Sequence, residues 1–388
     1  MARFFESITL TNLLSFGPEP TELELADVNV VVGPNGAGKS NLLEALNLLH
    51  HAPKGLGRPL REGGGVRECL WQRRGGASDA PQPIATIEAR IAAGRVGEST
   101  TRYRVSFTAQ AGRLSIVDES LEDVAVGGEV YFGYVNGEPS VSAGAGVLLP
   151  LQSSDPSKSI LAQLQDPRSY PELTRLGEQL EEIGVYRYWV GGPRSPLRSA
   201  CRADVPTRRL SEFLDNLPAR LAVLKRDPGV KGAIRAKLEE VSPGFDDIEV
   251  SPEGGVLQLY LQDGSRVISS HRLSDGTLRY LMLLAILLDP SPPPLILIEE
   301  PELSLHPDVL PVLRDLLLDA GRRSQVVVTT QSAAFLDAWT DHASAVVVCE
   351  RREGVTSLFR VDPAQFADDG VGLGTRWMRG EIGRQLGR

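Results

Sequence analysis

Residues 28–40, with the sequence VNVVVGPNGAGKS, decide the fold of this 388-residue chain. Val28–Val32 is a short β-branched run of the kind that forms a strand buried on both faces. Gly33–Ser40 matches the pattern G-x-x-x-x-G-K-S, and the apolar periodicity from Leu42 to Leu49 predicts a helix directly after it. A buried strand, a glycine-rich loop and a helix in this order predict an α/β fold.

The loop has the composition of a phosphate-binding turn. Its glycines let successive backbone N–H groups point at a phosphate, and the start of the following helix adds positive potential. Lys39 is expected to reach the β- and γ-phosphates of ATP, and the Ser40 hydroxyl to ligate Mg²⁺. An ordinary glycine-rich turn before a helix is the alternative. The residues expected to bind the nucleotide here are Gly33, Pro34, Asn35, Gly36, Ala37, Gly38, Lys39, Ser40 and Asn41.

A second apolar run ends in two carboxylates. Leu295–Ile298 predicts another buried strand, and Glu299 and Glu300 follow it directly. Glu299 is expected to hold the Mg²⁺ shell, and Glu300 to orient or deprotonate the water that attacks the γ-phosphate. Because Glu299 is one methylene longer than the usual Asp, we expect its Mg²⁺ contact to run through water. A buried strand with a solvated acidic end is the alternative.

A third motif opens a long apolar helix. Leu273-Ser274-Asp275-Gly276-Thr277 is a Ser/Asp/Gly helix start, and the free N–H groups of such a start can bind an anion. Taken alone, this segment is better explained as an ordinary N-cap.

Composition limits the class of protein. The net charge of −9 argues against a generally basic nucleic-acid coat protein but leaves room for a local basic face. Cys69, Cys201 and Cys349 are odd in number and far apart, which excludes a disulfide framework and a cysteine-based zinc site. No apolar run is long enough for a membrane helix, and Glu6 lies where a signal peptide needs apolar residues. We therefore expect a cytoplasmic protein that does not act at a membrane.

The order of the secondary-structure signals predicts three lobes. We expect residues 1–150 to hold the phosphate loop and an antiparallel β region, 151–245 to form an inserted, mainly helical lobe, and 246–388 to form a second ATPase lobe. Residues 52–82 and 127–156 are expected to be loops. Strands are expected at 84–91, 101–107, 114–117, 130–135, 248–250, 256–262, 295–298, 326–328 and 345–348, and helices at 280–288 and 310–318. No segment sustains the heptads of a coiled-coil arm.

Taken together, these motifs resemble the ABC-type ATPase heads of the RecF, SMC and overcoming-lysogenisation-defect families. The resemblance rests on the signature at Leu273–Gly276, on Glu299-Glu300-Pro301-Glu302 with Leu305-His306-Pro307, and on the N-terminal pattern Ile8-x-Leu10-x-Asn12 with Phe16. It implies a P-loop NTPase with an ABC-type head: a mixed or parallel sheet, an antiparallel β subdomain and an inserted helical lobe. The Glu299–Glu302 and Leu305–Pro307 motifs are similar to the form used by stand-alone bacterial ATPases of that group, so no C-terminal nuclease domain is expected.

The resemblance also implies a homodimer that forms head to head on ATP. Ser274 and Gly276 would contact, in trans, the nucleotide held by the other subunit, with Asp275 and Arg279 beside that contact. Gln331 stands where the family usually has a His that contacts the γ-phosphate. Glutamine can donate a hydrogen bond but carries no charge, so hydrolysis is expected to be slow or to depend on a partner. Gln72 and Gln82 are candidates for the metal-contacting glutamine of the first lobe.

Three biological roles follow from these features. One is an ATPase that clamps double-stranded DNA in repair, chromosome maintenance or phage defence. Another is a regulatory ATPase that controls a separate protein such as a nuclease, and a third, less favoured, is a transporter ATPase subunit. Two arginine groups are expected either to face DNA or to form intramolecular ion pairs: Arg58, Arg61, Arg67, Arg73 and Arg74, and Arg194, Arg198, Arg202, Arg208 and Arg209.

Overall fold

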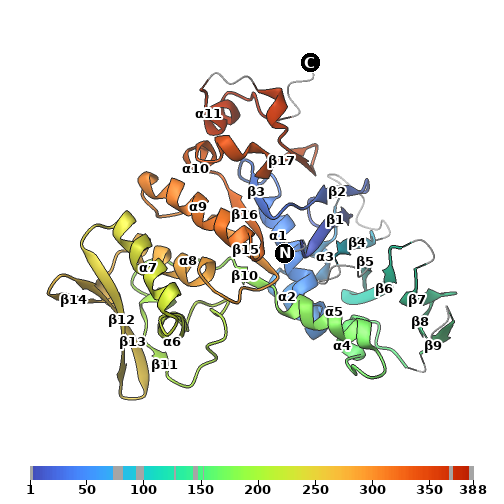
Figure 1. The fold of residues 1–388 in the computed structure, drawn as a ribbon. Helices are drawn as coiled ribbons and strands as arrows, with labels where there is room; N and C mark the ends of the chain where they lie inside the picture. The colour runs from blue at the N-terminus through green and yellow to red at the C-terminus, as the bar shows by residue number, and fades with distance from the viewer. Residues whose placement is uncertain are drawn as a thin grey trace. The chain divides into compact units, whose positions relative to one another are not determined.

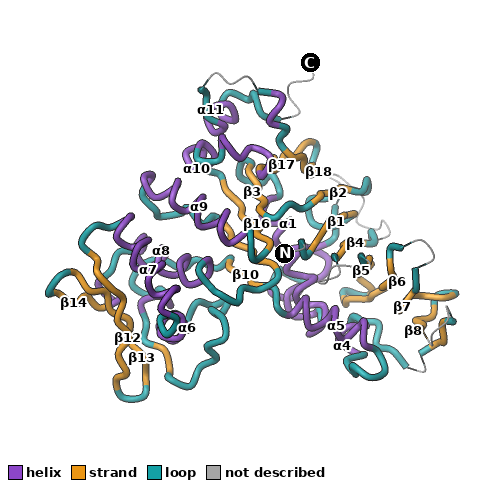
Figure 2. Tube along the Cα trace, viewed as in Figure 1, coloured by secondary structure: helices purple, strands orange, loops and turns teal. Residues whose placement is uncertain are grey.

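The computed structural model describes residues 3–72, 82–92, 100–125, 128–142, 147–151, 153–366 and 370–383. The chain divides into two compact units, Met1–Ile183 with Ser344–Pro363 and Gly184–Ala343 with Ala364–Arg388. The division after Ile183 falls inside residues 151–245, the segment expected from the sequence to form an inserted, mainly helical lobe. Both units combine helices and strands (Figure 2).

An antiparallel sheet dominates the first unit. Its strand order is β2-β1-β4-β5-β6-β7-β8-β9. Ile8 and Leu10 on β1 lie opposite Ala89 and Ile87 on β4, and all four side chains are fully buried. Because alternate residues of a strand point to the same face, these side chains place one face of the sheet on the core. The strands are β1 (Phe5–Thr11), β2 (Thr21–Glu24), β4 (Ala85–Ile91), β5 (Thr101–Gln110), β6 (Arg113–Asp123), β7 (Val130–Val135), β8 (Glu138–Ser142) and β9 (Leu148–Pro150).

The phosphate loop of the same unit follows a second, small group of strands. β3 (Val28–Val32) pairs in parallel with β17 (Val346–Arg352), which pairs with the antiparallel β18 (Val355–Arg360). Every residue of β3 is buried, as the β-branched run predicted, and α1 (Lys39–His51) begins directly after the loop. At the far end of α1, η1 (Ala52–Lys54) contacts α4 (Ile160–Gln163) and α5 (Pro171–Glu181).

Two segments expected to be loops contain regular structure. Residues 52–82 hold η1, α2 (Gly57–Glu62) and α3 (Val66–Cys69), helices too short to show periodicity in the sequence, although their side chains at Leu60 and Val66 are buried. Within 127–156, β7 is the strand expected at 130–135, and with β8 it forms a hairpin across Asn136 and Gly137, both with positive φ. Asn-Gly is the pair that such a tight turn favours, so this hairpin was present in the sequence as a signal.

The second unit is built on three parallel strands in the order β10-β15-β16. They are β10 (Gly184–Tyr186), β15 (Leu295–Glu299) and β16 (Gln325–Thr330), with Val185, Leu297 and Val327 in register. α8 (Asp275–Leu287) and α9 (Leu310–Gly321) pack on each other, and α9 contacts β16. α8 is buried almost all round from Leu278 onward, which explains its nearly continuous apolar sequence.

A small antiparallel sheet completes this unit. Its order is β11-β13-β12, with β14 on β13, and α6 and α7 lie against β12 (Figure 1). The elements are β11 (Cys201–Arg202), β12 (Phe245–Glu253), β13 (Val256–Asp263), β14 (Arg266–Ser269), α6 (Leu217–Leu224), α7 (Pro228–Val241), α10 (Ala333–Asp337) and α11 (Leu373–Met378). In the part of the chain that the structure describes, no helix has both the length and the apolar character needed to cross a bilayer.

Candidate functional site

The phosphate loop is built so that two of its glycines have no room for a side chain. A Cβ on Gly33 would lie 2.3 Å from the carbonyl oxygen of Cys349, on the neighbouring strand β17. A Cβ on Gly38 would lie 2.3 Å from Thr356 Oγ1, and Gly38 has a φ of 114°. Both positions therefore require glycine on steric grounds, and Gly38 requires it on conformational grounds as well.

The back of the loop is held by hydrogen bonds from residues distant in the sequence. Thr356 Oγ1 donates to the carbonyl oxygen of Ala37 over 2.7 Å and lies 2.7 Å from Ser15 Oγ. Asn41 Nδ2 donates to the same Ser15 oxygen over 2.6 Å. Ser15 and Thr356 were not among the site residues expected from the sequence, because nothing local marks a serine or threonine as the support of a loop far along the chain.

The front of the loop suits an anion. Lys39 is 6% exposed, and its ammonium donates to the carbonyl oxygens of Gly33 (2.8 Å) and Pro34 (3.1 Å), across the loop. The first turn of α1 carries no acidic residue, and no side chain caps it. Pro34, Asn35 and Gly36 are exposed, so the tip is open. A buried cation beside an uncapped helix start fits a nucleotide phosphate.

In the second unit, the turn after β15 carries the two predicted carboxylates in a strained backbone. We call residues 299–304 the acid turn. Glu300 has a φ of 47° and Ser304 a φ of 66°, values that residues other than glycine rarely adopt. Glu300 N donates to the carbonyl oxygen of Thr329 over 3.0 Å, and its own carbonyl accepts from Arg279 Nη2 over 2.8 Å. Strain of this kind concentrates at functional sites.

Arg279 joins the acid turn to helix α8. Its guanidinium centre lies 3.9 Å from the ring centroid of Trp189, a cation–π contact. Burial lowers the pKa of Arg279 to about 10, so the side chain stays charged at neutral pH. The Trp189 indole N–H donates in turn to the backbone carbonyl of Glu299. The carboxylate of Glu299 lies 3.2 Å from Arg187 Nε, so a cation bound by Glu299 would compete with a guanidinium.

Glu302 is a third carboxylate of the acid turn, and it was not among the site residues expected from the sequence. Its side chain is buried, and one oxygen accepts a hydrogen bond from the Thr330 hydroxyl. The other oxygen has no hydrogen-bond partner among the described residues. Burial, with the charge of Glu300 adding to it, raises the pKa of Glu302 to about 7, while Arg279 acts in the opposite direction.

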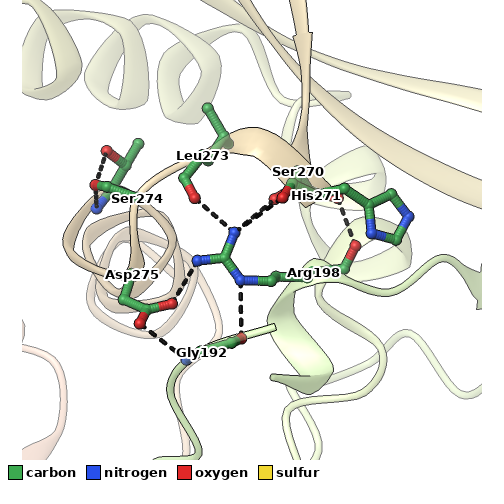
Figure 3. Close-up of polar contacts among 8 residues, drawn as sticks. Gly192, Arg198, Ser270, His271, Leu273, Ser274 and Asp275 are labelled. Carbon is green, nitrogen blue, oxygen red and sulfur yellow. Dashed lines mark hydrogen bonds and ion pairs between the residues drawn. The ribbon is translucent and has the colours of Figure 1, made fainter. Parts of the chain in front are cut away.

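The signature at Leu273–Gly276 forms the start of α8, with Ser274 as its N-cap. The Ser274 hydroxyl accepts the Thr277 N–H over 3.0 Å, and Ser274 itself is exposed. A Cβ on Gly276 would lie 2.6 Å from the carbonyl oxygen of Ser304, so glycine is required where the signature meets the acid turn. A hydrogen bond from Arg198, aided by the Gly192 N–H, lowers the pKa of Asp275 (Figure 3).

The remaining candidates are three exposed glutamines. Gln331 is exposed just after β16. Gln72 donates to the carbonyl oxygen of Arg67 over 3.3 Å, and Gln82 is exposed, so neither is singled out as a metal contact.

The two arginine groups differ from each other. Arg73 and Arg74 lie outside the described residues. Arg58 and Arg61 line a surface pocket of about 450 Å³ together with Lys54, Arg113 and Lys158. In the second group, the side chain of Arg198 is only 11% exposed and bonds within its own unit, which fits the alternative of an intramolecular ion pair. Arg202 pairs with Asp204 over 2.7 Å.

Comparison with known proteins matches this chain to one family profile and to solved structures of one fold. The family profile described as "AAA domain, putative AbiEii toxin, Type IV TA system" matches residues 28–124 and 141–337. Among solved structures, an SMC head bound to the C-winged helix domain of ScpA is 14% identical, with a TM-score of 0.59 over 93% of this chain and 99% of that one. A search of curated proteins gives no match.

Two further solved structures have the same fold. The Smc head of Pyrococcus furiosus, with an extended coiled coil and bound to the C-terminal domain of ScpA, is 13% identical, with a TM-score of 0.58 over 93% of this chain and 97% of that chain. The head from Pyrococcus yayanosii is 12% identical, with a TM-score of 0.53 over 93% and 98% of the two chains. These matches confirm the predicted fold class, that of a P-loop ATPase head.

Proposed function

This chain belongs to that AAA-domain family, and we propose that it binds and hydrolyses ATP as a switch that closes two copies of the chain on each other. The observation that carries the proposal is the phosphate loop. Its glycines at 33 and 38 have no room for a Cβ, and Lys39 is a buried cation at an uncapped helix start. This arrangement suits a triphosphate. A solvated glycine-rich turn without the buried cation would not bind such a charged group tightly.

Nucleotide binding begins with the exchange of partners at Lys39. Its ammonium exchanges the carbonyl oxygens of Gly33 and Pro34 for the β- and γ-phosphate oxygens, while backbone N–H groups of the loop surround the β-phosphate. The hydroxyl of Ser40 and the carboxylate of Glu299 are oxygen donors of the kind that Mg²⁺ prefers, and we propose them as its protein ligands. Bound Mg²⁺ would neutralise developing phosphate charge.

Hydrolysis is assigned to the acid turn. Glu300 orients a water molecule and accepts its proton as the water oxygen bonds to the γ-phosphorus and the bond to the bridging oxygen of ADP breaks. Arg279 and the strained backbone fix the position of Glu300. Gln331 supplies a neutral donor in place of a cationic one, so the chemical step is slow and the ATP-bound state is long-lived.

Closure is assigned to the exposed signature. Ser274 and Gly276 of one copy would cover the γ-phosphate held by the other copy, and ADP would release them. ATP thus acts by shifting a population from open to closed molecules.

The proposed target of the closed state is double-stranded DNA, contacted through a basic pocket of the first unit. We call the side chains of Lys54, Arg58, Arg61, Arg113 and Lys158 the basic pocket. Lys54, Arg58 and Lys158 form exposed ion pairs, at 3.5 Å, 2.9 Å and 3.5 Å. Arg61 and Arg113 have no ion pair with any other described residue. Exposed pairs contribute little, so phosphates can replace them.

A second candidate is a regulatory switch whose output is a protein. The family description names a toxin of a type IV toxin–antitoxin system, and two of the similar SMC heads were solved bound to parts of ScpA. These descriptions favour a protein partner for the closed state, such as a separately encoded effector.

ATP turnover with and without linear double-stranded DNA separates the two candidates. A DNA clamp shows turnover that DNA stimulates and that falls as salt rises, with Lys39→Ala and Glu300→Gln as inactive blanks. A rate of ATP turnover that is the same with and without DNA at every salt concentration would contradict DNA as the target. Turnover equal to wild type in both blanks would remove the ATPase itself.

A further inference from the structure

Arg198 lies at the centre of the signature turn, although it comes from a loop seventy or more residues earlier in the chain. It ends η2 (Pro196–Arg198), and its guanidinium points into the turn that leads to α8 (Figure 3). Nε donates to the carbonyl oxygen of Gly192 over 2.9 Å. Nη1 donates to the carbonyl of Leu273 and lies within 3.3 Å of those of Ser270 and His271. Nη2 bonds to the carboxylate of Asp275.

The backbone of Arg198 takes part as well. Its carbonyl oxygen accepts from the Ser270 hydroxyl over 2.7 Å, and Gln258 donates to that hydroxyl over 2.7 Å. Ser270 is fully buried, so this contact anchors the start of the turn. Gly192 N donates to Asp275 over 2.8 Å and closes the ring of contacts. The turn is therefore fixed from outside, by one planar group with five N–H donors.

The charge of the pair has a direct consequence for the proposed trans contact. Asp275 lies next to Ser274 and Gly276, the residues assigned to the γ-phosphate of the other copy. A carboxylate at this place would repel a triphosphate. Because Arg198 neutralises Asp275 and holds its carboxylate between Nη2 and Gly192 N, the exposed Ser274 hydroxyl and the start of α8 can meet an anion.

The same loop also reaches the acid turn. We call residues 187–198 the bracing loop. Near its beginning, Trp189 donates to the carbonyl of Glu299 and stacks on Arg279; at its end, Arg198 holds the signature. One short segment thus touches both the turn that would bind the other copy's nucleotide and the turn that carries the proposed base.

We propose that Arg198 is a positioning residue that shapes and neutralises the signature turn for its contact with the nucleotide of a second copy. This inference rests on the proposed function, because it needs ATP-dependent closure. It assigns to Arg198 a role in the closure step and none in the binding of ATP to the open chain.

Closure is measured as the concentration dependence of dimer formation in the Glu300→Gln chain with ATP and Mg²⁺, by analytical ultracentrifugation. Adding Arg198→Ala is expected to weaken dimerisation at least about tenfold, the effect of losing a charged hydrogen-bond donor. Binding of a fluorescent ATP analogue to the dilute chain stays within about twofold, since the phosphate loop is untouched. Arg202→Ala, an exposed arginine of the same region that pairs with Asp204, is the matched control and dimerises like its parent.

Two further variants separate positioning from general loss of structure. Arg198→Lys keeps the charge but not the planar set of donors, so it restores dimerisation only in part. Asp275→Asn in the Arg198→Ala background removes the unpaired carboxylate and is expected to restore part of the affinity. A residue that merely supports the fold would show no such rescue, so the absence of rescue overturns the electrostatic role even if Arg198→Ala is poorly folded.

The outcomes distinguish a failure of the role of Arg198 from a failure of the proposed ATP-dependent closure. If Glu300→Gln does not dimerise with ATP, the proposed closure is wrong and the role of Arg198 falls with it. If Glu300→Gln dimerises and the Arg198→Ala form does so equally tightly, closure stands and the role of Arg198 alone is wrong.

Discussion

Arg279 Nη2 donates a hydrogen bond to the backbone carbonyl of Glu300 over 2.8 Å. The donor belongs to the helix that the signature begins, and the acceptor is the residue assigned to activate water. Because Glu300 has a left-handed backbone, the bond holds a conformation that the residue would not adopt unaided. The bond therefore couples the backbone of the proposed base to the helix that the signature begins.

Arg279→Ala is expected to lower the rate of ATP hydrolysis at least about tenfold, because Glu300 loses the bond that positions it. ATP affinity is expected to remain that of the wild type. Steady-state turnover and equilibrium nucleotide binding, measured together, check this. Arg322→Ala, whose side chain is 81% exposed, is the control and should turn over normally. Wild-type turnover in Arg279→Ala would contradict the positioning role.

Gly38→Ala is expected to abolish ATP binding. Its Cβ would meet Thr356 Oγ1 at 2.3 Å, and its φ of 114° is strained for alanine. Gly55→Ala is a matched control, since Gly55 has a φ of 104° but open space around its Cβ. The control should lose stability by about 1 kcal/mol through backbone strain and still bind ATP. Isothermal titration calorimetry measures the ATP affinity of the two variants. ATP binding by Gly38→Ala at wild-type affinity would contradict the steric requirement for glycine at this position.

The free energy of unfolding is expected to depend on pH through Glu119. This fully buried carboxylate accepts from Tyr103 Oη (2.6 Å), Ser159 Oγ (2.6 Å) and the Ile160 N–H (2.8 Å). Burial nevertheless raises its pKa from 4.5 to about 7. The folded chain therefore binds this proton more tightly than the unfolded chain. The contribution is complete below pH 4.5 and is lost as the pH rises to about 7, by roughly 3 kcal/mol.

Glu119→Gln removes that titration. Denaturant unfolding at a series of pH values from about 5 to 8 should show the wild type losing stability relative to the variant as the pH rises. Parallel curves for the two proteins would mean that Glu119 does not titrate in this range.

Arg61 and Arg113 are expected to contribute to DNA binding by neutralising phosphates. Replacing both with Ala should weaken binding of linear duplex similarly for unrelated sequences and lower the slope of log affinity against log salt by about one for each arginine removed. Fluorescence anisotropy at several salt concentrations measures both quantities. Arg322→Ala is the control, since Arg322 is an exposed arginine outside the basic pocket and outside both arginine groups. An unchanged salt slope in the double variant would place DNA elsewhere or remove it as a target.

The parts of this fold that could be predicted are those encoded locally. The phosphate loop, β3, β15 and the start of α8 each show their pattern within a dozen residues, and each is where the sequence placed it. The supports of these elements could not be predicted, because they join distant segments. Thr356 holds a loop more than three hundred residues earlier, and Trp189 bonds to the carbonyl of Glu299. Such contacts arise from topology and leave no pattern in the sequence.

The role of Arg198 could not be predicted from the sequence either. A cluster of arginines in a Pro/Gly-rich segment has the composition of a nucleic-acid-binding loop, and only the structure shows that this member faces inward. Its partners are mostly backbone carbonyls, which any sequence supplies.

ATP-driven closure is tested most directly by the molar mass of Glu300→Gln in solution, with and without ATP and Mg²⁺, by light scattering. The expected mass is that of one chain without nucleotide and of two chains with ATP. Adding Lys39→Ala is expected to return the mass to one chain. A mass that stays at one chain with saturating ATP, or doubles equally in the Lys39→Ala form, would contradict ATP-driven closure.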